Sequence, residues 1–452
     1  MNKSFKTWWE RLLFRDRGIL PTPRLLLVLG LFSVGLIALS FSGLSWPWII
    51  VGNLMLLGVS LLDLRFSPGK NELQLERSVR QDMERDREEA VDIRITNTSP
   101  HSITFKMVDD VPGSFYRSSP VKGRVQGETA SQASYTTYAP IRGDYRFDKV
   151  YMRYQSRFGL WEKQYSPPIE NNVRVVPDLS ETRQFLEDPQ AFLLYEGPNV
   201  KKQQIGSGEF AKIRKYVVGD DLRKINWRQT AKLQELMTNE YEPEHGKYIS
   251  IFVDCGRMMG VELEESNRLE RSLEAALTVA AAALHNGDHV SFIAFSKEVK
   301  AYVPPNKGMQ HLQRIIDEMY NLQVDPYESN YGNVLQYLQA IQKKRSLLLL
   351  FSDVSTFLYE EAPLFYLQRV RRRHVFMMLG IEDHMTEAWT KEAPTNHKQA
   401  MIKSMAQKHT IEKKKELAKW EKQGLQMIET PEEKLATSAV SHYIDVMNKG
   451  LL

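Results

Sequence analysis

The sequence predicts a membrane-anchored multidomain chain, in which a two-helix transmembrane hairpin is followed by an antiparallel β-sandwich and a doubly wound α/β domain. Two adjacent apolar runs near the N-terminus indicate the hairpin, and short alternating stretches between residues 71 and 178 indicate the sandwich. Beyond residue 248, wholly apolar strands alternate with amphipathic helices. A chain of 452 residues is long enough to bury two or three separate cores.

The apolar runs have the length and order of a membrane hairpin, predicted over residues 25–64. Residues 25–44 carry no charge, and twenty residues at a rise of about 1.5 Å cover roughly the 30 Å of a bilayer core. A second uncharged run, residues 46–62, follows almost at once. A cleaved signal peptide fits less well, because the first run is too long, follows a basic leader over residues 1–24 and is succeeded by another apolar run.

Basic residues flank the predicted hairpin on both sides, whereas its connecting loop has no charge. They are Lys3, Lys6, Arg11, Arg15, Arg17 and Arg24 before it, and Arg65, Lys70 and Arg77 after it. Positive residues stay on the cytoplasmic side of a membrane. We therefore expect a two-span protein of the cell membrane, with both termini and the soluble domains in the cytoplasm.

Overall charge argues against a nucleic-acid partner. The 60 basic and 56 acidic residues leave a formal charge of +4, too small to indicate an electrostatic surface for phosphates. Cys255 is the lone cysteine, so an intramolecular disulfide is excluded.

Residues 71–178 read as short strands separated by turns. VDIRITN, ITFKMVD and VYMRYQS alternate apolar and polar residues, which is typical of strands with one buried face. Their spacing predicts a small antiparallel β-sandwich, expected to act as a spacer or docking module without chemistry.

Residues 179–247 are expected to form a polar linker that carries a signature segment, and residues 248–452 the α/β domain. Four apolar strands begin near Tyr248, His289, Ser346 and His374, with helix-periodic segments between them. Residues 385–426 are charged and strongly helical, which indicates either a solvated helical face or an arm that binds a partner.

The segment from Gly206 to His245 mixes arginine, lysine, carboxylates and aromatic residues at short spacing. It resembles the signature of the bacterial domain-of-unknown-function fifty-eight family, through Arg214, Tyr216, Gly219, Asp220, Arg223, Ile225, Trp227, Lys232 and Glu240. Elements of that family's β-sandwich are matched by Arg142-Gly143-Asp144-Tyr145 and by Phe158-Gly159-Leu160.

Such residue types favour charge-assisted hydrogen bonds, so we expect either a structural clamp or a partner-binding surface here. Phosphate binding is the alternative. Five carboxylates along the segment, at Asp220, Asp221, Glu235, Glu240 and Glu242, would repel phosphates.

The strand that ends in Asp254 resembles the first metal-binding loop of a von Willebrand A domain, in which two serines follow the aspartate. The resemblance implies that Asp254 and Asp353, at the ends of two parallel strands, are the outer ligands of a Mg²⁺ site. Gly256 and Met258 occupy the serine positions and offer no side-chain oxygen.

The middle loop of this expected site reads ESNYGNVL, with Ser329 or Asn330 near the position of its threonine ligand. We predict a degenerate site without bound metal, in which two unpaired carboxylates face each other with raised proton affinity. Weak Mg²⁺ binding through Asp254, Asp353 and water is the alternative. No other cofactor is expected.

Catalytic motifs are absent from the sequence: it contains no His-Glu-x-x-His, no Gly-x-Ser-x-Gly and no cysteine–histidine nucleophile pair. We therefore predict a non-enzymatic adaptor built around a von Willebrand A-like doubly wound α/β domain. The family resemblance implies a MoxR-type AAA+ ATPase as partner and, in some cases, a transglutaminase-like membrane protein, with a role in cell-envelope assembly. The alternatives are a metal-dependent hydrolase that uses Asp254 and Asp353, and a purely structural envelope protein.

Overall fold

The computed structural model describes residues 18–41, 43, 45–117, 120–194, 209–217, 220–242, 246–264, 266–358 and 362–452. The chain forms two compact units, Met1–Val176 and Pro177–Leu452, which are described separately. Most of the basic leader, residues 1–17, lies outside the described residues, as does Gly219 of the signature segment.

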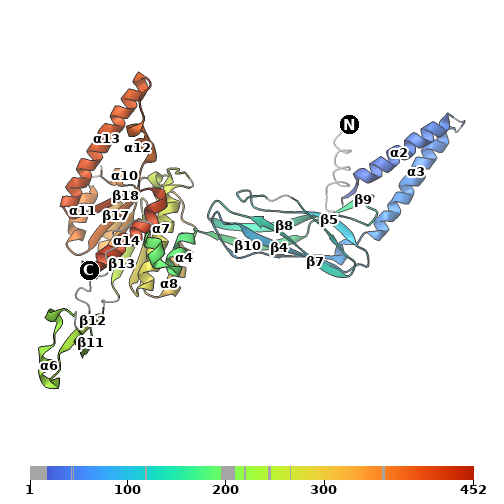
Figure 1. The fold of residues 1–452 in the computed structure, drawn as a ribbon. Helices are drawn as coiled ribbons and strands as arrows, with labels where there is room; N and C mark the ends of the chain where they lie inside the picture. The colour runs from blue at the N-terminus through green and yellow to red at the C-terminus, as the bar shows by residue number, and fades with distance from the viewer. Residues whose placement is uncertain are drawn as a thin grey trace. The chain divides into compact units, whose positions relative to one another are not determined.

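The first unit contains the two apolar helices and the β-rich region (Figure 1). Its helical elements are α2 (Pro23–Ser40), α3 (Trp46–Ser60) and the 3₁₀ turns η1 (Leu61–Phe66) and η2 (Lys70–Glu72). Its strands are β1 (Ile19–Pro21), β2 (Leu73–Ser78), β3 (Asp82–Glu84), β4 (Glu89–Asn97), β5 (Ile103–Asp109), β6 (Val121–Val125), β7 (Thr129–Thr137), β8 (Gly143–Gln155), β9 (Trp161–Tyr165) and β10 (Pro168–Val176).

Helices α2 and α3 lie side by side as a hairpin (Figure 1). The Thr22 hydroxyl caps α2 by accepting from the Leu25 amide, and a proline stands in the first turn of each helix, where its missing N–H costs nothing. The Ser33 hydroxyl donates to Asn53 Oδ1 at 2.7 Å and so joins the two helices. Both are long and apolar enough to cross a membrane, and most of their apolar side chains are exposed.

Two sheets enclose the core of the β-rich region. One has seven strands, with β1, β9, β8, β10 and β3 in sequence across it and β5 and β6 attached to β8, and the other has the order β2-β4-β7. The strand pairs are antiparallel except β10 with β3. Ile93, Phe105 and Phe147 are among the side chains buried between them. The predicted antiparallel sheets are therefore present.

A buried ion pair crosses this core. Arg77 Nη2 bonds Asp109 Oδ1, with side chains 0% and 1% exposed, and the Arg77 guanidinium also lies 5.2 Å from the centre of the Phe147 ring. The Tyr135 hydroxyl donates to the same carboxylate. Burial, followed by the Asp109 charge, raises the pKa of Tyr135 far above its usual value.

The hairpin is tied to the β-rich region at both of its ends. Strand β1 precedes α2 and pairs with β9, so the end of the expected leader is part of the sheet and not a separate segment. After α3, Asp63 accepts from the Leu160 amide at 2.9 Å, the Trp161 amide at 3.2 Å and the Ser156 hydroxyl. Both ends of the hairpin therefore contact the same loop, residues 156–161. The start of α2 and the end of α3 thus lie at the same end of the hairpin.

The second unit begins with two helices and a small hairpin. These are α4 (Ser180–Glu187), α5 (Pro189–Leu194), β11 (Glu209–Lys215), η3 (Leu222–Lys224), α6 (Trp227–Leu233) and β12 (Met237–Glu242). We call the described residues from β11 to β12 the signature hairpin.

The α/β region follows. Its strands are β13 (Tyr248–Asp254), β14 (His289–Phe295), β15 (Val299–Asn306), β16 (Ser346–Phe351), β17 (Val375–Ile381) and β18 (Gln426–Thr430). Its helices are η4 (Arg257–Gly260), α7 (Arg268–His285), α8 (Met309–Met319), α9 (Tyr331–Ile341), α10 (Val354–Leu358), α11 (Ala362–Arg371), α12 (His384–Lys391), α13 (His397–Lys422), η5 (Glu432–Lys434) and α14 (Leu435–Asn448).

These six strands form one sheet in the order β15-β14-β13-β16-β17-β18, parallel except for the edge strand β15. Numbered along the chain, this is the order 3-2-1-4-5-6 of a doubly wound sheet. Apolar side chains of α9, α10 and α11 pack with the strands in one core cluster, while α7 packs with α8 and α14. The order reverses between β13 and β16, where such sheets bind ligands.

Two parts of this unit differ from the sequence-based expectation. Residues 180–194 were expected to be linker but form α4 and α5, with Phe185 and Phe192 buried, and the Thr182 and Thr278 hydroxyls lie 3.1 Å apart. The C-terminal region also adds β18 to the sheet and the largely buried helix α14, in addition to the expected charged helices.

We predict that Asp63→Asn weakens the attachment of the hairpin. The amide of the variant would place N–H donors against the donors that Asp63 now accepts, so the free energy of unfolding should fall by about 2–4 kcal/mol. Thermal or denaturant unfolding of the full chain in detergent measures this. Asp148→Asn, which changes an exposed ion pair of β8, is the control and should cost little. Equal effects of the two variants would contradict the assignment.

Glu181 should make stability depend on pH. Burial, and then repulsion by Glu274, raises the pKa of Glu181 to about 7 from its ordinary 4.5. A raised pKa in the folded state adds stability below pH 4.5 that is lost as the pH rises through about 7. The stability difference between the wild type and Glu181→Gln should therefore fall over that interval. Glu187→Gln, at the exposed end of α4, should leave the profile unchanged; a wild-type profile parallel to that of Glu181→Gln would refute the prediction.

Candidate functional site

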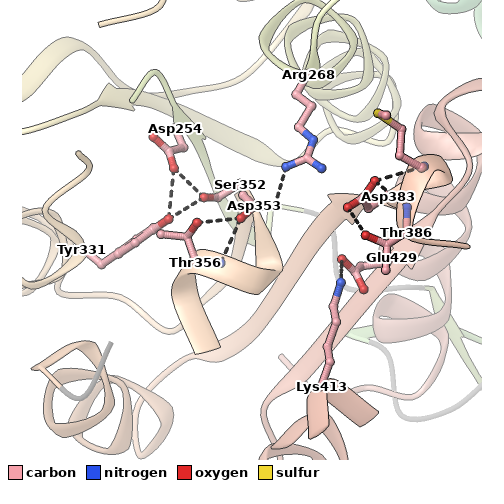
Figure 2. Close-up of polar contacts among 11 residues, drawn as sticks. Asp254, Arg268, Tyr331, Ser352, Asp353, Thr356, Asp383, Thr386, Lys413 and Glu429 are labelled. Carbon is pink, nitrogen blue, oxygen red and sulfur yellow. Dashed lines mark hydrogen bonds and ion pairs between the residues drawn. The ribbon is translucent and has the colours of Figure 1, made fainter. Parts of the chain in front are cut away.

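Asp254 ends β13 at the point where the strand order reverses, and its carboxylate is surrounded by protein donors (Figure 2). Its Oδ1 accepts from the Gly256 amide at 2.7 Å and from the Ser329 hydroxyl. Its Oδ2 accepts from the Tyr331 hydroxyl at 3.1 Å and from the Ser352 hydroxyl. Two carboxylate oxygens offer about four acceptor positions, so no position remains for a metal ion.

The loop geometry explains why serine is missing after Asp254. A Cβ added to Gly256 would lie 2.0 Å from the Ser329 hydroxyl oxygen, which is closer than any real contact. A serine at position 256 would therefore clash with Ser329 in its present place. Of the two residues expected near the threonine position, Ser329 lies beside Asp254 and serves as a hydrogen-bond donor. Asn330 instead caps α9 by accepting from the Asn333 amide.

Asp254, Tyr331 and Ser352 contact one another in a triangle of polar atoms. The Tyr331 and Ser352 oxygens lie 2.8 Å apart, and both also contact Asp254 Oδ2, so two hydroxyl protons serve three contacts. Burial raises the pKa of Asp254 although the hydrogen bonds oppose it, and burial followed by the Asp254 charge raises that of Tyr331 well above its usual value.

Asp353 does not face Asp254 as a second unpaired carboxylate, so that expectation is wrong. Arg268, at the start of α7, bonds Asp353 Oδ1 through Nη1 at 2.5 Å, with both side chains nearly buried. The other oxygen accepts from the Thr356 amide at 2.8 Å and hydroxyl at 2.6 Å, which caps α10 (Figure 2). The arginine supplies the positive charge that a divalent ion would supply.

Two further carboxylates along this edge also have structural partners (Figure 2). Asp383 caps α12 by accepting from the amides of Met385 and Thr386; burial opposes ionisation, but the Thr386 hydrogen bonds hold the pKa of Asp383 below its usual value. Glu429 pairs with Lys413 of α13 at 2.6 Å, and burial raises the pKa of Glu429. Among the described residues, no group of three or more histidine, cysteine, aspartate or glutamate side chains could hold a metal. The residues present therefore do not fit a Mg²⁺ site.

The signature hairpin brings together three of the residues predicted to form a clamp. Arg214 and Asp220 form a bidentate ion pair at 2.8 and 2.7 Å, and the Tyr216 hydroxyl donates to the Asp220 carbonyl at 3.4 Å. The Arg214 hydrogen bond, together with the Val217 amide, lowers the pKa of Asp220. These contacts hold the chain that leaves β11.

Three other predicted residues of this segment do not join the clamp. Arg223, Trp227 and Lys232 are exposed, with Trp227 68% exposed. Glu240 lies on β12, opposite Lys212 of β11.

Sequence reasoning missed a set of exposed apolar side chains on the same hairpin. Besides Trp227 they are Val217, Leu222, Leu233 and Leu236. We call these five residues the apolar set. They follow neither a helical nor a strand period, so no periodicity marks them; the one signal visible in the sequence is their density within a polar segment.

Residues 212–415 match the family model described as protein of unknown function DUF58. The match begins in the signature hairpin and runs into α13.

A curated relative, the uncharacterized protein YeaD of Bacillus subtilis (strain 168), is 24% identical over 183 residues. That alignment covers 40% of this chain and 44% of the relative, so the chain matches less than half of that protein's length.

Solved structures resemble parts of this chain only distantly. A conserved hypothetical protein BatB from Bacteroides thetaiotaomicron is 11% identical with a TM-score of 0.29, over 45% of this chain and 100% of that one. A PapD-like domain of human CEP192 is 10% identical with a TM-score of 0.18, over 24% of this chain and 89% of that one. Likenesses at these TM-scores carry no argument about fold or function.

We predict that Arg268→Ala is strongly destabilising, because it leaves the buried Asp353 without its counter-charge. The expected loss in the free energy of unfolding is about 3–5 kcal/mol. Arg257→Ala, which removes an exposed pair with Glu328, should cost less than about 1 kcal/mol.

A double variant separates the ion pair from simple loss of packing. Replacing Arg268 by Met together with Asp353 by Leu should recover much of the stability lost in Arg268→Ala, because no buried charge is then left alone. Denaturant unfolding of the full chain in detergent measures all three. No recovery in the double variant would contradict the argument.

Proposed function

We propose that this chain is a non-enzymatic, membrane-anchored adaptor that binds protein partners through its second unit. The observation that carries the proposal is the apolar set of the signature hairpin, in which Trp227 is 68% exposed and the nearby Arg223, Arg228 and Lys232 are exposed as well. Tryptophan and arginine dominate the energetics of protein interfaces, whereas soluble surfaces rarely leave such side chains grouped and uncovered.

The contacts at the carboxyl edge of the sheet favour a binding protein over an enzyme. The strand order and the places of Asp254 and Asp353 are consistent with a von Willebrand A-like domain, and the closed contacts of both carboxylates argue against their use as metal ligands or general bases. A metal-dependent hydrolase at this edge would need Asp254 free of its four donors. The adaptor is therefore the better supported function.

Two apolar helices that open on the same side support an anchor with both soluble units on one face of the membrane. We place that face in the cytoplasm because of the basic flanks, which include Arg24 and Arg65. A cytoplasmic MoxR-type AAA+ ATPase is the partner we propose, for a role in cell-envelope assembly, and the support is the family resemblance of the signature segment alone.

The test is the affinity of the full chain, in detergent, for the MoxR-type ATPase of the same cell. Trp227→Ala should weaken binding by about thirty-fold or more, as expected for an interface hot spot. Trp389→Ala, which removes a tryptophan that is 42% exposed on α12, is the matched control and should bind normally.

Asp254→Asn should also leave this affinity unchanged, since the carboxylate is closed off from solvent. Normal binding by Trp227→Ala would contradict the assignment of the surface. No binding by the wild-type chain would contradict the ATPase partnership.

A further inference from the structure

The outer face of the seven-stranded sheet carries a row of positive charge across three neighbouring strands. In the register of the sheet, Lys122 of β6 lies opposite Lys106 of β5, and Lys106 lies opposite Arg153 of β8. All three side chains are exposed, and none forms an ion pair with a carboxylate that the structure describes. We call these three residues the cationic row. Like charges directly opposite on paired strands repel one another.

The adjacent row, nearer the hairpin, adds one more cation. Arg124 lies opposite Thr104, and both are exposed. A carboxylate, Glu162, occupies the β9 end of that row, opposite Gln155. The face therefore remains positive around Lys106, where the outer edge of the sheet is formed by β6.

The cationic row stands at a defined height above the hairpin. Arg153 lies three residues before Ser156, whose hydroxyl bonds Asp63 directly after α3. At about 3.3 Å per residue along a strand, Arg153 is about 10 Å from this junction, and Lys106 and Lys122 lie one and two strands to its side. The contacts of Asp63 with residues 156–161 keep that distance fixed. Where α3 leaves a bilayer, a charge about 10 Å away lies within roughly one Debye length of the headgroups.

The base of the same region has the residues of a membrane interface. Phe66 and Phe158 are 44% and 61% exposed, and their rings form a T-shaped pair with centroids 5.9 Å apart. Arg65 and Arg157, beside them in sequence, are also exposed. Aromatic rings belong at the level of lipid headgroups, and long basic side chains reach from there toward phosphates.

We propose that this face of the first unit docks on the headgroups of an anionic membrane, with the cationic row binding lipid phosphates and the two phenylalanines resting in the interface. The proposal rests on the hairpin crossing the membrane and is independent of any ATPase partner. Its occupant is a lipid surface and not an acidic protein, because the charge continues directly from the base of the membrane helices.

The experiment uses the full chain with Thr104→Cys carrying an environment-sensitive fluorophore; Cys255 is buried and does not compete for the label. The protein is placed in vesicles of phosphatidylcholine, with or without phosphatidylglycerol, that contain a lipid with a nitroxide on its headgroup. Quenching should be several-fold stronger with phosphatidylglycerol. High salt should return it to the phosphatidylcholine level, since the Debye length falls to about 3 Å at 1 M.

Substitutions test whether the cationic row causes the preference for anionic lipid. One cation near an anionic surface is worth a factor of about five in affinity, so Lys106→Gln, Lys122→Gln and Arg153→Gln together should weaken docking on anionic lipid by about a hundred-fold and reduce quenching with phosphatidylglycerol to the phosphatidylcholine level. The control is Arg94→Gln, which changes an exposed arginine on β4 of the other sheet, opposite Glu76, and should retain the preference.

Equal quenching in the two kinds of vesicle would overturn the proposal, and so would a triple variant that still prefers phosphatidylglycerol. Complete displacement by inorganic phosphate, or by polyglutamate, would assign the face to a soluble anion or an acidic protein and would also overturn it. If the triple variant does not fold, the salt comparison on the unmodified face decides the question alone.

Discussion

The saturated carboxylate of Asp254 is the constraint on which the interpretation of this chain depends. It lies where a doubly wound sheet presents its ligand site, yet the backbone of Gly256 and three hydroxyl groups use its acceptor positions. Removing water from a carboxylate is costly, and these donors offset much of that cost. A group held in this way stabilises the meeting point of two strands and two loops; it has no free lone pair for chemistry.

The same substitution of protein groups for an ion recurs at Asp353. Arg268 neutralises this aspartate from the first turn of α7, and Thr356 uses its other oxygen to begin α10. Protein donors therefore occupy both carboxylates at this edge of the sheet. The exposed apolar side chains of the apolar set are on the signature hairpin. The proposed binding surface and the structural carboxylates are thus separate in the second unit, with Trp227 on the surface and the carboxylates in the interior.

Much of this architecture follows from residue patterns that a single sequence displays. The strand Ser346–Phe351 is almost wholly apolar because both faces of the sheet are covered, and the helical hairpin comes from two long runs without charge. Strand β18 was not predicted because Gln426–Thr430 is short and partly polar, as suits an edge strand. Helices α4 and α5 were overlooked because their polarity masked the two buried phenylalanines, Phe185 and Phe192.

The site was harder to predict than the fold, since its deciding contacts join residues far apart in sequence. Arg268 and Asp353 are separated by 85 positions, and no local sequence pattern predicts that they form an ion pair. The absence of serine after Asp254 was visible, but its cause, the hydroxyl of Ser329, was not. Titration of the full chain with Mn²⁺, followed by electron paramagnetic resonance, tests the central claim most directly. The account predicts no saturable binding that depends on Asp254, whereas stoichiometric binding that is lost in Asp254→Asn would contradict it.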